Sequence, residues 1–174
     1  MEREKTAERR GSLSRRGSGV SDFEIGAVDE ESFQRQFPLG CPSVVLTTER
    51  DFTTQLTAVQ LCLGSRDWRR RITGLSLLRA LSLAAPSLHP ELAVGLYPLT
   101  QPLASCLAEL RSQVVKETCL TLACLAQELS HLVEKILLPL LSPLLSLLTA
   151  APRVASSSGL IALRFLLHNC PFPG

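Results

Sequence analysis

The sequence predicts an all-α protein, an α-solenoid of three stacked helical hairpins that follows a disordered N-terminal tail. Apolar residues make up 45% of the 174 residues but aromatic residues only 5%. The apolar excess is mostly Leu and Ala, which form helices well and strands poorly. In addition, an apolar pattern repeats about every 42 residues in the second part of the chain. This length suffices for one medium domain and a tail.

Residues 1–50 are expected to form the tail. They contain a basic block at residues 3–16 and an acidic block at residues 22–31, without a sustained apolar period. Segments with this composition cannot bury enough apolar surface to offset the entropy of ordering, so we expect disorder here.

Two short motifs in the tail place paired arginines before a serine. They are residues 9–12, RRGS, and residues 15–18, also RRGS, a pattern that basophilic kinases recognise. Ser12 and Ser18 are therefore candidate phosphorylation sites, where phosphate would weaken contact with an acidic surface. The basic stretch could equally add nonspecific attraction to such a surface.

A helical domain is expected over residues 51–174, because apolar residues recur there at spacings of three and four. The predicted helices cover residues 51–64, 67–84, 90–108, 110–129, 131–149 and 152–169. Links such as Ser65-Arg66 and Ala150-Ala151 are very short, so neighbouring helices must run antiparallel. The sequence therefore predicts three successive hairpins.

A shift of 42 residues superimposes the three hairpins. The matched sets are Arg69, Arg111 and Arg153; Leu77, Cys119 and Ile161; Leu78, Leu120 and Ala162; Leu81, Ala123 and Phe165; and, in the first helices, Leu61, Leu103 and Leu145. A two-helix unit of this length is typical of HEAT and armadillo repeats, in which each hairpin needs a neighbour to bury its second apolar face. The last predicted helix still carries several leucines, so we expect further repeats or a protein partner at the C-terminal edge.

Composition and motifs argue against several classes of function. The three histidines stand at unrelated positions, and no P-loop, GxGxxG, HExxH or nucleophile–base arrangement is present, so no enzyme activity is expected. The six cysteines are scattered without metal-ligand spacing and are expected to be reduced core residues of a cytoplasmic protein, with no metal and no cofactor. A net charge of +2 does not indicate a nucleic-acid partner.

One apolar segment raises the question of a membrane. Residues 136–151 carry no charge but include Pro139 and Pro143. The segment is shorter than the roughly 20 residues that a spanning helix needs. A buried helix is favoured over a membrane anchor, which stays as an alternative, and no apolar stretch of signal-peptide type follows the basic N-terminus.

The turns within the hairpins are the expected binding positions, since helical arrays expose them along one ridge. Arg69, Arg111 and Arg153 should form a basic column suited to an acidic protein surface. They could instead be solvated helix starts, or pair internally with acidic residues such as Glu109 and Glu117. Trp68, the only tryptophan, is either an exposed anchor or a hydrophobic cap on the preceding helix.

Three strings resemble successive HEAT helices of a CLASP-type TOG domain, over about residues 51–170. They are DWRRRI at residues 67–72, LRSQVVKETC at 110–119 and SSGLIALR at 157–164. The resemblance implies binding to tubulin or microtubules by the turns, regulation of microtubule dynamics or organisation, and a place in the cytoplasm at the cytoskeleton. The expected tubulin-binding residues are Trp68, Arg69, Arg71, Arg111, Ser112 and Arg153.

The chain departs from that family because it supplies only the first three repeats of a longer array. The later turns of the family have no counterpart in this sequence. The alternative is therefore a generic HEAT-repeat scaffold, or a truncated isoform with little tubulin binding.

Overall fold

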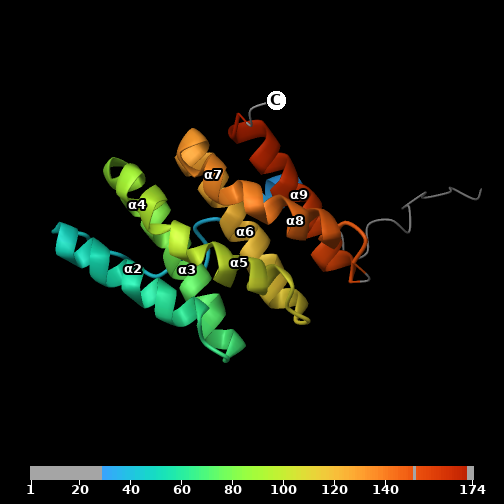
Figure 1. Ribbon diagram of the computed structural model, residues 1–174, viewed down its shortest axis with the longest axis horizontal. Helices are drawn as coiled ribbons and strands as arrows, with labels where there is room; N and C mark the ends of the chain where they lie inside the picture. The colour runs from blue at the N-terminus through green and yellow to red at the C-terminus, as the bar shows by residue number, and fades with distance from the viewer. Residues whose placement is uncertain (1–28, 151, 172–174) are drawn as a thin grey trace, which may run out of the picture.

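The computed structural model describes residues 29–150 and 152–171, and every regular element within those ranges is helical. The prediction of an all-α solenoid is confirmed: helical hairpins stack one after another from α2 to α9 (Figure 1). Ser12 and Ser18, the candidate phosphorylation sites, lie outside the described residues.

Each hairpin pairs a first helix with a long, unbroken second helix. The second helices are α3 (Trp68–Ala84), α6 (Ser112–Leu129) and α9 (Arg153–Asn169). The first hairpin begins with α2 (Glu49–Leu63). The second begins with the 3₁₀ turn η1 (Pro86–Leu88), α4 (His89–Gly95), η2 (Tyr97–Leu99) and α5 (Thr100–Leu107). The third begins with η3 (Ser130–Val133), α7 (Glu134–Leu137), η4 (Leu138–Leu140) and α8 (Leu141–Leu147).

The expectation of continuous helices at residues 90–108 and 131–149 is wrong. Pro98 and Pro139 interrupt them, and each lies in the first turn of a short 3₁₀ segment. Proline has no N–H and clashes with the preceding turn inside a helix, whereas the first turn tolerates it. The first helix of the first hairpin, α2, contains no proline and is unbroken.

The spacing of the hairpins is less regular than a constant shift of 42 residues. The second helices begin at Trp68, Ser112 and Arg153, which are 44 and 41 residues apart. In consequence Arg69 is the second residue of α3, whereas Arg111 is the N-cap of α6. The three predicted arginines all lie at helix starts, but they do not occupy one structural position.

The predicted match of leucines in the first helices is wrong for the same reason. Leu103 is fully buried, whereas Leu61 and Leu145 are 69% and 51% exposed. The buried positions are instead Leu63, Leu103 and Leu144. Leucine is so abundant in this chain that a shift by one or two residues still aligned leucine with leucine.

An N-terminal strap, defined here as residues 29–48, is ordered and packs on the second helices. It contains α1 (Glu30–Gln34), which Asp29 caps by accepting a hydrogen bond from the Ser32 N–H at 2.7 Å. Phe33 and Phe37 are buried, and the Phe37 ring meets Phe165 of α9 edge to face at 5.4 Å. Residues 29–48 of the expected tail therefore pack on the helices, through these two aromatic side chains and through hydrogen bonds such as that of Gln34 with Gln127 at 2.9 Å.

Arg79 is a buried cation that joins α3, α6 and the strap. Its side chain is 1% exposed. Nη1 donates to Glu117 Oε2 at 2.9 Å and to Thr121 Oγ1 at 3.0 Å, while Nε donates to the Phe37 carbonyl at 3.3 Å. A buried charge is tolerated only when it is paired and hydrogen-bonded, and these contacts fulfil that requirement.

The stretch Ser112–Leu147 is long and apolar enough, by length and composition alone, to cross a membrane. In the fold, Ser130 has a positive φ of 48° and separates α6 from the helices that follow. Helix α6 lies in the middle of the core, with α3 on one side and α9 on the other. A core helix passes the same test, so one such stretch is weak evidence for a membrane span.

All six thiols are free, and Cys106, Cys119, Cys124 and Cys170 are buried among apolar side chains. Burial raises the pKa of the Cys119 and Cys124 thiols to about 12 and that of Cys170 to about 11. The reactive thiolate is therefore scarce at neutral pH.

Replacement of Arg79 by Ala is expected to lower the free energy of unfolding by about 3 kcal/mol, because it leaves the Glu117 carboxylate without its partner. Chemical denaturation followed by circular dichroism measures the loss. Arg50→Ala, at an exposed position in the first turn of α2, should change stability by no more than about 0.5 kcal/mol. Equal effects of the two variants would contradict the role given to Arg79.

Alkylation of the native protein at neutral pH is expected to modify Cys41 and Cys62, which are only half-buried, before the four buried thiols. Mass spectrometry after a timed reaction with iodoacetamide identifies the modified residues. Rapid native labelling of Cys119 or Cys124 would contradict the described packing of α6.

Candidate binding surface on the hairpin turns

The first turn holds Trp68 at the start of α3 through a set of local hydrogen bonds. The Asp67 carboxylate caps the helix by accepting from the Arg69 N–H at 3.0 Å. The Ser65 hydroxyl accepts from the Asp67 N–H at 3.1 Å. Asp and Ser favour such positions because their short side chains reach the unpaired N–H groups of a helix start. The cap therefore fixes where the indole leaves the backbone.

The Trp68 ring lies close to two guanidinium groups from different hairpins. Arg69 Cζ is 4.8 Å from the ring centroid and Arg111 Cζ is 5.8 Å from it. Both distances are within the range of cation–π attraction. Trp68 is also half-buried and packs on the core, so it combines the two interpretations that the sequence left open. Part of the indole is a structural hydrophobe and part is accessible.

The Glu109 carboxylate connects the first two turns by accepting hydrogen bonds from two arginines. Arg71 Nη2 donates to Glu109 Oε2, and Arg111 Nη1 donates to Glu109 Oε1 at 3.4 Å. The Arg71 side chain is only 15% exposed, whereas that of Arg111 is 57% exposed. Of the two, Arg111 is the cation that a partner can reach, and Arg71 joins the hairpins internally.

The ionisation of Glu109 follows from this pairing. Burial pushes the pKa of the Glu109 carboxyl upward, but the hydrogen bond and the charge of Arg71 outweigh burial and hold the pKa below its usual range. The carboxylate is therefore charged at neutral pH and keeps both arginines in place.

The remaining predicted site residues lie at the starts of α6 and α9. Ser112 is the half-buried first residue of α6. Arg153 is the exposed first residue of α9, and its carbonyl accepts a hydrogen bond from the Ser157 hydroxyl at 2.7 Å. The described contacts thus join the first two turns into one cluster, while Arg153 belongs to the third turn.

Leu110 is a surface residue of the second turn that the sequence analysis did not select. It is 96% exposed and stands beside Arg111. Its signal in the sequence is a leucine between Glu109 and Arg111, outside the apolar period of the flanking helices. We call Trp68, Arg69, Leu110 and Arg111 the turn cluster; it combines apolar surface with positive charge.

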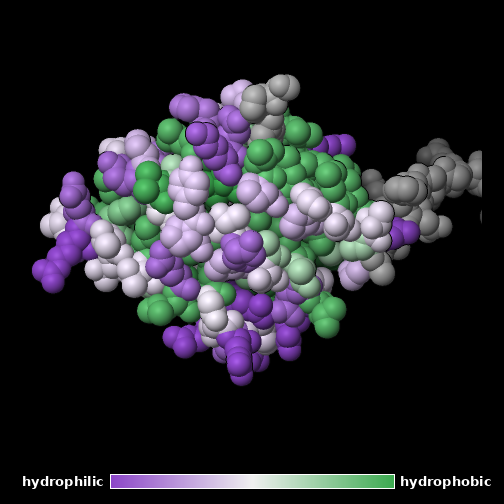
Figure 2. All heavy atoms as spheres, in the orientation of Figure 1, coloured by the Kyte–Doolittle hydropathy of each residue, from purple (hydrophilic) through white to green (hydrophobic). Residues whose placement is uncertain are grey.

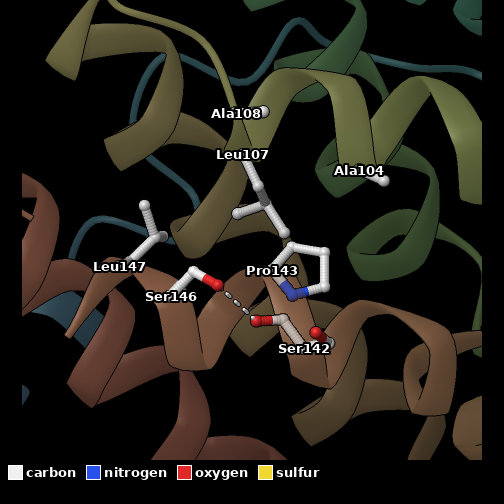
Figure 3. Close-up of a pocket in the computed structure, with 7 residues that line it drawn as sticks. All are labelled: Ala104, Leu107, Ala108, Ser142, Pro143, Ser146 and Leu147. Atoms are coloured by element: carbon white, nitrogen blue, oxygen red, sulfur yellow. Dashed lines mark hydrogen bonds between the residues drawn. The ribbon is translucent and has the colours of Figure 1, made fainter. Parts of the chain in front are cut away.

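A groove lies between α5 and α8, on the contact between the second and third hairpins (Figure 3). It is lined by Ala104, Leu107, Ala108, Ser142, Pro143, Ser146 and Leu147. The Ser146 hydroxyl donates to the Ser142 carbonyl at 3.0 Å. The lining offers no side chain that titrates near neutral pH, so it has no group for acid–base chemistry.

The array of HEAT-like helical hairpins places the chain in the class of α-solenoid repeat proteins, and its first two turns present an aromatic residue close to two cations. No protein-family model matches the chain. The resemblance to CLIP-associating proteins is confirmed by curated relatives.

The relatives align with nearly the whole chain. This chain is 29% identical to CLIP-associating protein 1-A of Xenopus laevis and 28% identical to CLIP-associating protein 1 of Xenopus tropicalis, and each alignment covers 97% of this chain. It is also 28% identical to CLIP-associating protein of Drosophila melanogaster over 86% of this chain. The chain spans only 12%, 12% and 10% of the lengths of these three relatives.

Replacement of Glu109 by Gln is expected to lower the free energy of unfolding at pH 7 by about 2 kcal/mol, since Arg71 loses a charged acceptor. The pKa of Glu109 is depressed in the folded state, so its contribution is complete above the ordinary value of 4.5 and is lost as the pH falls through the folded-state pKa. The difference from wild type should therefore shrink in acid. Urea titrations at several pH values measure it.

Glu91→Gln serves as the control, because Glu91 is exposed in α4. A destabilisation by Glu109→Gln that did not change with pH would contradict the ion-pair explanation.

Proposed function

We propose that the chain is a tubulin- or microtubule-binding module that acts through the turn cluster and Arg153. The observation that carries the proposal is the Trp68 ring, which lies within cation–π distance of the guanidinium groups of both Arg69 and Arg111. The module works by binding and not by catalysis. It acts in the cytoplasm, at the cytoskeleton, where it regulates microtubule dynamics or organisation.

The chemistry of the turn cluster suits a partner with a negatively charged surface. Tryptophan and arginine are the residue types most enriched among interface residues that dominate binding energy. The charges steer an acidic partner, while Trp68 and Leu110 supply apolar area that loses contact with water on binding. Because Glu109 holds Arg111 and Asp67 holds the backbone of Arg69, the cluster is partly ordered before a partner arrives. This reduces the entropy lost on binding.

Similarity supports the choice of tubulin as the acidic partner. The strings around Trp68 and Arg111 resemble the HEAT helices of CLASP-type TOG domains, whose turns contact tubulin, and the curated relatives are CLIP-associating proteins. The described array holds three hairpins, so its contact area is smaller than that of a longer array. We therefore expect weak, salt-sensitive binding.

Size-exclusion chromatography of the full chain with soluble tubulin tests the proposal, together with co-sedimentation on microtubules. Trp68→Glu and Arg111→Glu are expected to weaken binding by about 30-fold or more, the effect of removing about 2 kcal/mol at a central contact. Because Trp68 is the only tryptophan, Trp68→Glu has no tryptophan fluorescence, so the fold of both variants is checked by circular dichroism.

Arg50→Glu is the matched control for Arg111→Glu. It makes the same charge change in the first turn of α2, away from the turn cluster. It should bind like wild type. Equal loss in all three variants would indicate nonspecific charge attraction. A folded wild type that binds neither tubulin nor microtubules would favour the alternative, a HEAT-repeat scaffold for another protein.

A further inference from the structure

Leu110 lies in the turn between α5 and α6 and has the largest exposed fraction, 96%, among the large apolar residues that the structure describes. A leucine left in water contributes nothing to the core, and burying it is favourable. Figure 2 shows hydrophilic side chains over the lower end of the molecule, where Figure 1 places this turn beside the turn between α2 and α3. Leu110 is therefore an apolar projection from a charged surface.

Two ordinary structural roles for a leucine at this position do not apply. Leu110 directly precedes Arg111, the N-cap of α6, and an apolar residue there can brace a helix start by packing on the fourth helical residue, here Val115. Val115 is 2% exposed, so it is covered without Leu110, which stays in water. A following hairpin would not cover Leu110 either, because it would pack on the third hairpin, whereas this turn belongs to the second.

The backbone holds Leu110 in place even though its side chain is exposed. Its N–H donates to Glu109 Oε1 at 3.0 Å, and Glu109 Oε2 accepts from Arg71 of α3. On the other side, the Arg111 carbonyl accepts from the Val114 N–H at 3.0 Å, which fixes the start of α6. Both neighbours are anchored, so a partner that covers Leu110 has little more than side-chain rotamers to order.

Exposed cations accompany this leucine. Arg111, the next residue, is 57% exposed, and its guanidinium lies 5.8 Å from the centroid of the Trp68 ring. The first turn adds Arg66, Arg69 and Arg70, which are also exposed, and the ion pairs found among the described residues involve none of these three. A partner that complements the whole surface offers carboxylates around an apolar hollow.

This surface would distinguish two kinds of acidic partner. A flexible acidic segment can bring carboxylates to the arginines, but it has no fixed hollow for a leucine and loses entropy when it becomes ordered. A folded acidic surface can hold both features in place, so that the leucine leaves water as the charges pair. Leu110 therefore adds affinity only for the folded kind.

We propose that Leu110 is the residue by which the turn cluster selects a folded acidic surface with an apolar hollow over flexible acidic chains. The arginines attract either kind of partner, and Leu110 discriminates between them. This inference rests on the proposed function of the turn cluster and goes beyond it by naming the feature that the partner supplies.

Binding to two partners tests the proposal. Microtubules serve as the folded acidic surface, measured by co-sedimentation, and a fluorescein-labelled polyglutamate chain serves as the flexible one, measured by fluorescence anisotropy. Both are measured at low ionic strength, where charge attraction to a flexible chain is strongest. The full chain with Leu110→Ser is expected to bind microtubules about 10-fold more weakly, the effect of losing one buried leucine side chain, and to bind polyglutamate like wild type. Arg111→Glu should weaken both, because both partners use its charge.

Leu167→Ser is the matched control. It makes the same change at a leucine that is 61% exposed in the last turn of α9, at the opposite end of that helix from Arg153. It should bind both partners like wild type, and circular dichroism verifies that all variants keep their helices.

The outcomes separate this inference from the proposed function. If Leu110→Ser binds microtubules like wild type, or loses affinity for polyglutamate to the same extent as for microtubules, Leu110 does not discriminate and the inference is wrong, while the proposed function stands. A wild type that binds neither soluble tubulin nor microtubules overturns both.

Discussion

The buried guanidinium of Arg79 is the contact on which most of the arrangement depends. It belongs to α3, pairs with Glu117 of α6 and donates to the carbonyl of Phe37 in the strap. Apolar packing between hairpins is not directional and would tolerate sliding of one helix along another. A buried charge with fixed acceptors does not, because a shift would leave the charge unpaired. Arg79 thus sets the register in which leucines and alanines of the first two hairpins pack.

The same kind of contact connects the core to the accessible surface. Arg71 stands two helical turns before Arg79 on α3, and its acceptor Glu109 precedes Glu117 by the same number of residues. The two ion pairs are therefore successive links between α3 and the segment formed by α6 and the turn that precedes it. Glu109 also holds Arg111, so the link nearest the surface orients a cation beside Trp68. The geometry of the turn cluster follows from the contact between hairpins, not from the turn alone.

Patterns in the sequence predict the second helices well, since their apolar residues recur over about five turns and few prolines interfere. They predict the first helices less well, because Pro98 and Pro139 divide segments whose leucine content suggests continuity. The positions of Trp68 and Arg111 at helix starts were predictable, whereas their closeness was not. It arises because two hairpins of unequal spacing stack, and no local pattern encodes that distance. The contacts of Arg79 were not predictable, because a lone arginine in an apolar stretch has no partner that the sequence identifies.

The strap changes the folding cooperativity expected of the array. In a simple stack each hairpin contacts only its neighbours, so an end unit can unfold while the remainder stays folded. Here residues 29–48 contact α3 through the Phe37 carbonyl, α6 through Gln34 and Gln127, and α9 through Phe37 and Phe165. A segment from the beginning of the chain is thereby fastened to its last described helix. If the third hairpin unfolded, the strap would lose its contact with α9 and would cover the first hairpin less firmly. The strap therefore couples the folding of the two ends of the described array.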